Sequence, residues 1–278
     1  MMSEKGPIGV FDSGYGGLTV LKSIKKELPQ FDYIYLGDNA RAPYGSRSFE
    51  VILEYSLEAV KWFFKQGCPL VIFACNTASA KALRTIQQRY LPELDNTRRV
   101  LGVIRPTVEA IEKYTKTNRV GVLGTIGTIV SESYPIEIEK LFPHIKTYQQ
   151  ACPLWVPIVE HEEMNNAGAD YFIQKDIQAL LNQDNEIDTI ILGCTHYPLL
   201  INTIRRFVPE HINLISQDHI VAASLADYLN RHPEIEERLN KNSEIRFFTT
   251  DNIDLFNKRA KIFFGDEVSA QRVIHLSE

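Results

Sequence analysis

Two cysteines carry the most reactive chemistry that this sequence offers. Cys75 and Cys194 each follow a short apolar run, at 70–74 and 189–192, and each precedes polar residues that are able to cap a helix. A sulfur at the start of a helix faces backbone N–H groups and the positive end of the helix, and both favour the thiolate form. A single such cysteine is more often a small buried residue, but two in matching contexts favour a pair of reactive thiols.

The other two cysteines lack this setting. Cys68 and Cys152 do not stand between an apolar strand and a capping sequence, so we assign them to packing. No two of the four cysteines have the spacing of a metal motif, and we expect neither a bound metal nor a structural disulfide in a reducing compartment.

Two opposed thiols fit the inversion of a stereocentre next to a carboxylate. That reaction removes a proton from one face of a carbon and returns a proton to the other face, so it needs a base and an acid of similar pKa. A helix end that lowers the pKa of cysteine from ~8.5 toward neutrality would let one thiolate and one thiol coexist near pH 7. Acyl transfer by Cys194 with His196 is the alternative, but it leaves Cys75 without a role.

Short β-rich runs alternate with segments of helical period, which predicts an α/β fold with doubly wound, mostly parallel sheets. In such sheets the chemistry lies at the carboxyl ends of the strands. Asp38 follows the second predicted strand, and a structural role fits it as well as a role in a functional site at the strand ends. The predicted strands lie at 8–11, 33–36, 70–74, 100–103, 120–123, 189–192 and 212–215.

A weak internal repeat relates the two halves of the chain. The run at 8–16 resembles 120–127, and the run at 71–75 resembles 190–194, at nearly the same spacing. A duplication would give two related units that each present one cysteine at a strand-to-helix turn. Chance similarity of short apolar strands is the other explanation.

Composition excludes several classes of protein. The chain has 278 residues, of which 44% are hydrophobic and 23% charged, so it is long enough for one large or two smaller folded units. Its formal net charge is -5 and it has no block of basic residues, so we expect no nucleic-acid partner. No apolar run approaches the ~20 residues of a membrane span, and the first residues do not form a signal peptide. We therefore expect a cytoplasmic protein without a membrane partner.

Six motifs in register resemble the glutamate racemase family. The resemblance runs from about residue 8 to about residue 260, and the six together are far more specific than any one alone. The motifs are Asp-Ser-Gly with Gly-Gly at 12–17, Ala-Pro-Tyr-Gly at 42–45, Ala-Cys-Asn-Thr-Ala-Ser at 74–79, Gly-Val-Leu-Gly-Thr at 121–125, Ala-Cys-Pro-Leu at 151–154 and Gly-Cys-Thr-His-Tyr-Pro at 193–198.

The resemblance implies a cofactor-independent enzyme that interconverts L- and D-glutamate and supplies D-glutamate for peptidoglycan. It also implies two similar α/β domains that face each other across the site. We place the first domain at 1–99 and 212–278 and the second at 100–211. By the same resemblance we expect a homodimer, a small-molecule substrate and no cofactor.

By position in these motifs, Cys75 and Cys194 would be the two acid/base residues. Asp12 would assist Cys75, while His196, with the carboxylate of Glu160 nearby, would assist Cys194; Asp12 could instead be only a turn or capping residue. Hydroxyls, amides and backbone N–H groups would hold the substrate carboxylates without an arginine. The implied substrate contacts are Asp12, Ser13, Tyr44, Gly45, Asn76, Thr77, Thr195 and His196.

Two stretches depart from the family pattern. Arg105 stands where we expect Glu, and Ser-Gln-Asp at 216–218 replaces a more usual Asp-Ser-Gly or Asp-Pro. Both lie outside the cysteine motifs, so they concern the contact between domains or regulation rather than the reaction.

Three other functions were weighed against this one. A dinucleotide enzyme is disfavoured because Thr19 occupies the third glycine position of G-x-G-x-x-G. Aspartate racemase, or another Cys-Cys racemase, shares the chemistry and is the closest alternative. A non-catalytic small-ligand binding protein would not need paired cysteines.

Overall fold

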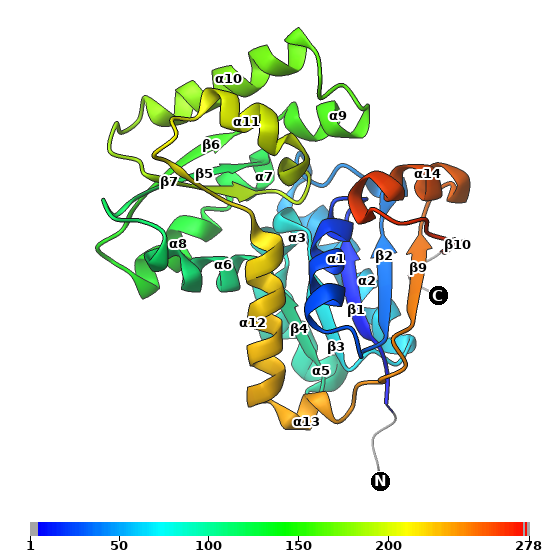
Figure 1. Ribbon diagram of the computed structural model, residues 1–278. Helices are drawn as coiled ribbons and strands as arrows, with labels where there is room; N and C mark the ends of the chain where they lie inside the picture. Colours follow the sequence, from blue (N-terminus) through cyan, green and yellow to red (C-terminus); the bar gives the residue numbers. More distant parts are fainter. Residues whose placement is uncertain (1–4, 275, 277–278) are drawn as a thin grey trace.

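Two parallel sheets organise the chain, and each forms the centre of a lobe (Figure 1). The computed structural model describes residues 5–274 and 276. The strands are β1 (Ile8–Asp12), β2 (Tyr33–Gly37), β3 (Leu70–Phe73), β4 (Arg99–Gly102), β5 (Arg119–Gly124), β6 (Lys146–Ala151), β7 (Thr189–Gly193), β8 (Asn213–Ile215), β9 (Ile245–Thr249) and β10 (Ala270–Arg272). The six-stranded sheet of the larger lobe has the order β10-β9-β2-β1-β3-β4, and the four-stranded sheet of the smaller lobe has the order β6-β5-β7-β8.

Helices cover both faces of each sheet. They are α1 (Gly17–Glu27), α2 (Phe49–Lys65), α3 (Asn76–Lys81), α4 (Leu83–Thr85), α5 (Leu91–Asp95), α6 (Ile104–Ala110), α7 (Ile126–Val130), α8 (Ser133–Leu141), α9 (Trp155–Glu160), α10 (Ala167–Leu181), α11 (Ile201–Phe207), α12 (Gln217–Arg231), α13 (Pro233–Glu236) and α14 (Ile253–Phe264), with short turns η1 (Asn39–Arg41), η2 (Ile86–Tyr90), η3 (Ile111–Lys113) and η4 (Tyr197–Leu200). None of the helices in the described part of the chain is long and apolar enough to cross a bilayer.

The two sheets repeat one topology. The order β2-β1-β3-β4 in the larger lobe matches β6-β5-β7-β8 in the smaller lobe, so β3 and β7 hold equivalent places. All pairings between these strands are parallel. The predicted α/β fold with two similar parallel-sheet domains is confirmed, and the sequence repeat has a structural counterpart.

The seven predicted strands are present, and three further strands were missed. β6 and β10 lie at sheet edges, and β9 pairs with β2 beside β10. β6 reads Lys-Thr-Tyr-Gln-Gln-Ala and lacks the apolar run of a buried strand. An edge strand needs only one neighbour, so a polar sequence is tolerated there.

The chain crosses between the lobes near residues 103 and 216. β4 belongs to the larger sheet and β8 to the smaller one. We propose that the chain enters the smaller domain between β4 and α6 and returns between β8 and α12. After the return, α12 runs along the side of the larger lobe and packs on α1 (Figure 1).

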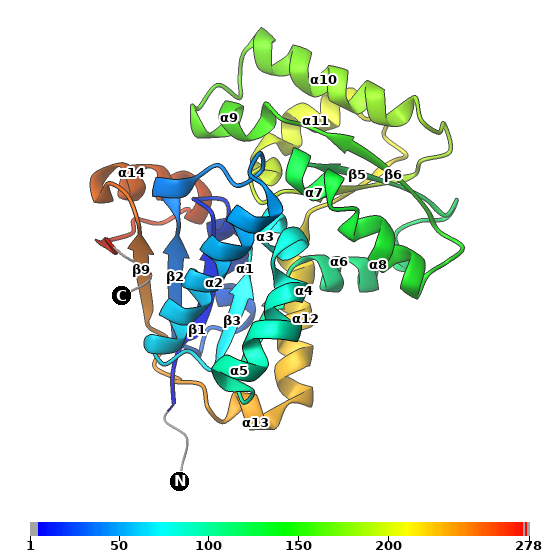
Figure 2. The same cartoon turned by 180° about the vertical axis from the view of Figure 1, so that it is seen from behind.

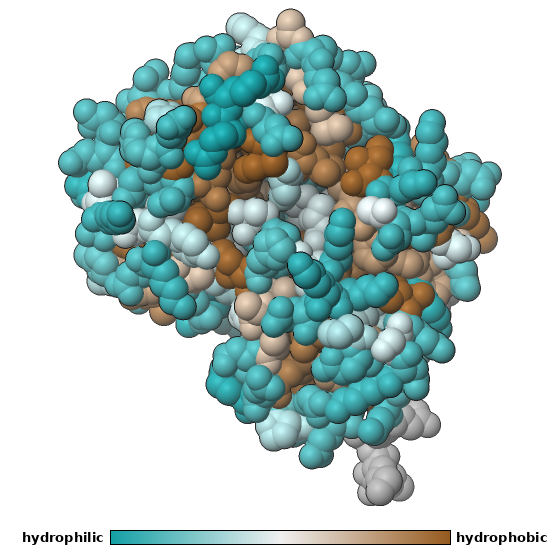
Figure 3. All heavy atoms as spheres, viewed as in Figure 1, coloured by the Kyte–Doolittle hydropathy of each residue, from teal (hydrophilic) through white to brown (hydrophobic). Residues whose placement is uncertain are grey.

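Alternation along β1 separates two layers of core. Ile8 and Val10 pack in the cluster that includes helix α1, whereas Phe11 packs in the cluster that includes α2 on the opposite face (Figure 2). This is the two-residue period of a strand buried on both faces. The first of these clusters also contains Leu192 and Trp155 of the smaller lobe, and apolar residues gather where the lobes meet (Figure 3). One of the three hydrophobic clusters of the described residues therefore spans both lobes.

Equivalent glycines in the two central strands let a helix approach closely. A Cβ atom on Gly9 in β1 would lie 2.6 Å from Cδ1 of Phe63 in α2, and one on Gly121 in β5 would lie 2.7 Å from Cδ2 of Leu180 in α10. Real Cβ contacts are longer, so each glycine is required by the packing above it.

The substitution Gly9→Ala tests this packing. We expect a loss of ~1 to 3 kcal/mol in the free energy of unfolding, because the new methyl group overpacks the core against Phe63. Urea unfolding followed by circular dichroism measures the change. Phe63→Leu should cost less in the Gly9→Ala background than in the native chain. Equal costs in the two backgrounds would contradict the account.

Candidate active site

Strand ends from both lobes open into one pocket of about 140 Å³. Cys75 comes from the end of β3 and Cys194 from the end of the equivalent strand β7. The pocket is lined by Ser13, Ala42, Pro43, Tyr44, Gly45, Ser46, Cys75, Asn76, Thr77, Thr125, Ile126, Cys152, Pro153, Val156, Pro157, Glu160, Cys194, Thr195 and His196. The structure thus brings the two predicted thiols to one cavity between the lobes.

The Cys75 side is built from the start of a helix and the loop after β1. Cys75 is the N-cap of α3, and its sulfur accepts a hydrogen bond from the backbone N–H of Ala78 at 3.5 Å. Its S–H group donates to Ser13 Oγ, also at 3.5 Å. Cys75 is only 5% exposed, and it lines the pocket.

Burial decides the protonation of Cys75. Desolvation, followed by the negative charge of Asp12, raises the pKa of the Cys75 thiol to about 12, and the hydrogen bonds with Ser13 and Ala78 oppose this shift. The expectation that a helix end lowers the pKa of this thiol is therefore wrong for Cys75. Two hydrogen bonds from one short helix and loop do not compensate for removal of the thiolate from water.

The Cys194 side carries a chain of hydrogen-bonding groups. Cys194 Sγ lies 3.9 Å from His196 Nδ1, and His196 Nε2 lies 3.0 Å from Glu160 Oε1 in α9. Burial opposes the charged imidazole, but the interactions with Cys194 and Glu160 outweigh it and raise the pKa of His196 to about 10. His196 is therefore an imidazolium near pH 7, with a proton and a positive charge beside the sulfur. The carboxylate of Glu160 orients and stabilises this cation.

Asp12 lies behind the Cys75 side. It is 1% exposed, and its Oδ2 accepts a hydrogen bond from Gly14 N at 2.9 Å. Within the part of the chain that the structure describes, Oδ1 is buried without a hydrogen-bond partner. Desolvation raises the pKa of Asp12, while the charge of His196 lowers it. Asp12 is not among the residues that line the pocket, and its assistance to Cys75 stays a prediction.

Some of the predicted substrate contacts line the pocket with a polar side chain, whereas the polar group of Tyr44 is hydrogen-bonded to another residue. Ser13, Asn76, Thr77 and Thr195 line the pocket with hydroxyl or amide groups. No lysine or arginine lines it in the described residues, so neutral donors and His196 would have to bind the carboxylates.

Tyr44 is present at the pocket, but its hydroxyl is already used. The Tyr44 hydroxyl donates to Asp38, and Asp38 also accepts from Arg41 Nε at 2.7 Å and from Thr250 Oγ1 at 2.9 Å. Asp38 therefore holds the loop that carries Tyr44. A substrate contact from Tyr44 and Gly45 would have to use their backbone.

The sequence assigned no site role to Thr125, which the structure places at the pocket. Thr125 caps α7 and its Oγ1 lies 2.9 Å from Thr77 Oγ1, so the two hydroxyls join the lobes at the pocket wall. Its position directly after β5 was the available signal. Cys152 also lines the pocket, although its sulfur faces the Gln150 carbonyl at 3.7 Å and its side chain is buried.

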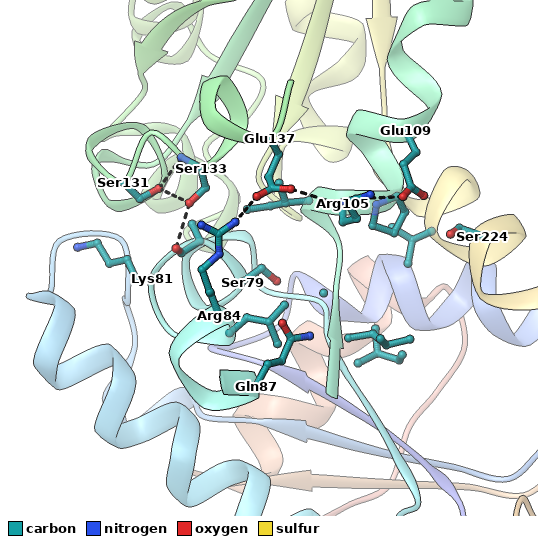
Figure 4. A pocket seen from close by; sticks show the side chains of 18 of the residues that line it. Ser79, Lys81, Arg84, Gln87, Arg105, Glu109, Ser131, Ser133, Glu137 and Ser224 are labelled. Carbon is teal, nitrogen blue, oxygen red and sulfur yellow. Dashed lines mark hydrogen bonds and ion pairs between the residues drawn. The ribbon is translucent and has the colours of Figure 1, made fainter. Parts of the chain in front are cut away.

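A second, larger pocket of about 530 Å³ lies away from the cysteines, against α4, α6, α8 and α12. Arg105, one of the departures from the family pattern, donates to Glu109 at 2.7 Å and to Glu137 at 3.4 Å, and Glu137 also pairs with Arg84 (Figure 4). Neither thiol of the site lines this pocket. One of these ion pairs, between Arg84 in α4 and Glu137 in α8, joins the two lobes.

Residues 5–274 and 276 hold no cluster of three or more His, Cys, Asp or Glu side chains suited to a metal ion. The ionisable groups of the pocket are thus arranged as pairs and chains around the two sulfurs.

Comparison with known proteins agrees with this arrangement. The family model described as Asp/Glu/Hydantoin racemase matches residues 8–223. A glutamate racemase of Persephonella marina is 39% identical over 267 residues, which is 96% of each chain.

Solved structures agree as well. A glutamate racemase isoform from Bacillus anthracis superposes with a TM-score of 0.87 at 36% identity, covering 96% of this chain and 97% of that one. The glutamate racemase of Francisella tularensis, solved in complex with D-glutamate, gives a TM-score of 0.86 at 32% identity and 98% coverage of both chains. The chain belongs to the Asp/Glu/hydantoin racemase family and, within it, to the glutamate racemases, which are isomerases.

Proposed function

We propose that this protein interconverts L- and D-glutamate by proton transfer between the α-carbon of the substrate and the two thiols Cys75 and Cys194. The observation that carries the proposal is the placement of both sulfurs at one pocket, on the ends of equivalent strands β3 and β7. The Francisella relative solved with D-glutamate supports glutamate as the substrate.

The reaction needs no group beyond the two thiols and the substrate. One cysteine, as a thiolate, takes the α-proton and becomes a thiol, and the electron pair stays on the α-carbon next to the carboxylate. The other cysteine gives its proton to the opposite face and becomes a thiolate. By family resemblance, Cys75 takes the proton from D-glutamate and Cys194 takes it from L-glutamate. The proposal requires neither pyridoxal phosphate nor a metal ion.

The two sides differ in how they stabilise charge. On the Cys194 side, the His196 imidazolium balances a thiolate and is itself held by Glu160. On the Cys75 side, the buried carboxylate of Asp12 lies behind the pocket lining, and we propose that it attracts the substrate ammonium group toward that side. Burial is the main cause of the raised pKa of Cys75, and an ammonium group there would offset the smaller contribution from the negative charge of Asp12.

Ser13, Asn76, Thr77 and Thr195 are proposed to bind the two carboxylates of glutamate. Their hydroxyls and amide line the pocket. The relatives' names support glutamate rather than the shorter aspartate as the substrate. We further propose that the product D-glutamate supplies peptidoglycan, and that the protein works in the cytoplasm as a homodimer. These last proposals rest on the sequence and the family resemblance.

Removal of either site thiol tests the two-base reaction. We expect Cys75→Ala and Cys194→Ala each to lower kcat by at least ~100-fold, because one face of the α-carbon then lacks an acid or base. Cys68→Ala is the matched control: Cys68 is equally buried but does not line the pocket, so it should keep full activity, and Cys152→Ala should also racemise. Circular dichroism of D-glutamate and of D-aspartate follows the reaction and separates the two substrates. Full activity in either of the first two variants would end the proposal.

Isotope effects test the assignment of Asp12 and His196 to opposite faces. L- and D-glutamate have equal free energy in water, so kcat/KM must stay equal in both directions, and asymmetry appears only in kcat, KM and isotope effects. In Asp12→Asn we expect a larger primary deuterium effect with α-deuterated D-glutamate than with the L-form, and in His196→Asn the reverse. Equal effects with both enantiomers in both variants would refute the one-sided roles.

Titration of Cys75 tests the protonation that the structure indicates. In a variant with Cys68, Cys152 and Cys194 replaced by Ala, the pH dependence of the rate of alkylation by iodoacetamide reports the thiolate of Cys75 alone. A thiol whose pKa is raised to about 12 stays neutral through pH 9 and ionises only in strong alkali. Adding Asp12→Asn to this variant should shift the midpoint down, because a nearby negative charge is removed. A midpoint at or below the reference of ~8.5 would contradict the burial argument.

A further inference from the structure

A closed ring of buried hydrogen bonds lies directly behind the pocket. Asn76 Nδ2 donates to Gln217 Oε1 at 2.7 Å, Gln217 Nε2 donates to the Tyr134 hydroxyl at 2.5 Å, and Tyr134 donates to Asn76 Oδ1 at 2.7 Å. The three side chains are 0 to 4% exposed. Asn76 starts α3 next to Cys75, Tyr134 lies in α8 of the smaller lobe, and Gln217 starts α12 where the chain returns to the larger lobe.

The ring by itself has no preferred direction. If both amides and the tyrosine hydroxyl rotated, each donor would again meet an acceptor and three hydrogen bonds would remain. The reversed ring would, however, place the amide oxygen of Asn76 where its nitrogen now lies. The chemistry that Asn76 presents therefore depends on what fixes the direction.

Thr107 in α6 fixes the direction. Its hydroxyl donates to the Val103 carbonyl at 2.8 Å, so its oxygen is left as an acceptor, and Gln217 Nε2 donates to it at 2.9 Å. A reversed Gln217 would place its own oxygen against that acceptor, and relief would require breaking the Thr107–Val103 bond. A buried pair of acceptors without a proton is costly. The Val103 carbonyl thus sets the orientation of Gln217, and Gln217 sets that of Asn76.

This direction leaves one amide hydrogen of the ring unused. Both N–H groups of Gln217 have acceptors, whereas Asn76 uses one of its two among the described residues. Asn76 lines the pocket. The spare donor of the ring therefore belongs to the residue that meets the substrate.

We propose that Gln217 is a positioning residue, which, held by Thr107, fixes the amide of Asn76 so that it offers an N–H donor to a carboxylate of the substrate. Gln217 lies in the stretch 216–218, where Ser-Gln-Asp departs from the Asp-Ser-Gly or Asp-Pro that the family pattern leads us to expect. The inference rests on the proposed racemisation of glutamate.

Thr107→Val and Thr107→Ser form the test, because valine keeps the shape of threonine and removes the acceptor, whereas serine keeps the oxygen. In Thr107→Val the two directions of the ring become equivalent, so about half of the molecules offer the Asn76 donor, and we expect the KM for D-glutamate to rise about 2-fold with kcat unchanged. Thr107→Ser should restore the native KM. Gln217→Met should raise KM at least as much as Thr107→Val.

The double variant separates positioning from general packing. If Thr107 acts through Gln217, then Gln217→Met with Thr107→Val should have the KM of Gln217→Met alone. Additive losses, or a fall in kcat and melting temperature with KM unchanged, would overturn the inference. So would a native KM in Thr107→Val when the native protein racemises glutamate. If the native protein does not racemise glutamate, the proposed function fails, and the inference fails with it.

Discussion

The proposed proton transfer at both faces of one carbon requires two acid/base groups that face each other across a pocket, and the architecture meets this constraint. A single parallel sheet presents its strand ends along one edge, so it cannot surround a substrate. The chain has two sheets in which four strands follow the same order, with Cys75 after β3 and Cys194 after β7, and one hydrophobic cluster spans both lobes. This cluster holds the two strand ends in a fixed relation without any covalent link.

Similar strands do not give the two sulfurs similar surroundings. Cys75 is backed by the carboxylate of Asp12 and by a helix N-terminus, and burial keeps its proton on. Cys194 is backed by the charged His196 and by Glu160. In the free protein the Cys75 side is therefore in its proton-donating form, which under the proposed assignment is the form that completes the conversion of L-glutamate. Under the same assignment, the reverse reaction needs Cys75 as a thiolate, so the substrate complex has to favour loss of the proton that burial keeps on this sulfur.

The sequence predicts what depends on apolar runs and strand ends, and it misses what depends on tertiary contacts. Seven strands were predictable because they are apolar, whereas β6 is polar at a sheet edge. Ser13, Cys75 and Cys194 were predictable because they follow strands, whereas Tyr44 and Glu160 were named only through the family resemblance. The use of the Tyr44 hydroxyl by Asp38, the raised pKa of Cys75 and the ring around Gln217 were not, because each depends on burial or on side chains from separate elements.

The measurement that tests the two-thiol reaction most directly is racemisation of D-glutamate in deuterium oxide, stopped at low conversion and analysed by mass spectrometry of the separated enantiomers. If one cysteine takes the proton and the other supplies a new one, the L-glutamate formed carries deuterium at the α-carbon and the remaining D-glutamate carries none. Starting from L-glutamate should give the mirror result. An L-product that keeps the original α-proton, or deuterium that enters both enantiomers at the same early rate, would show that a single group serves both faces and would contradict the account.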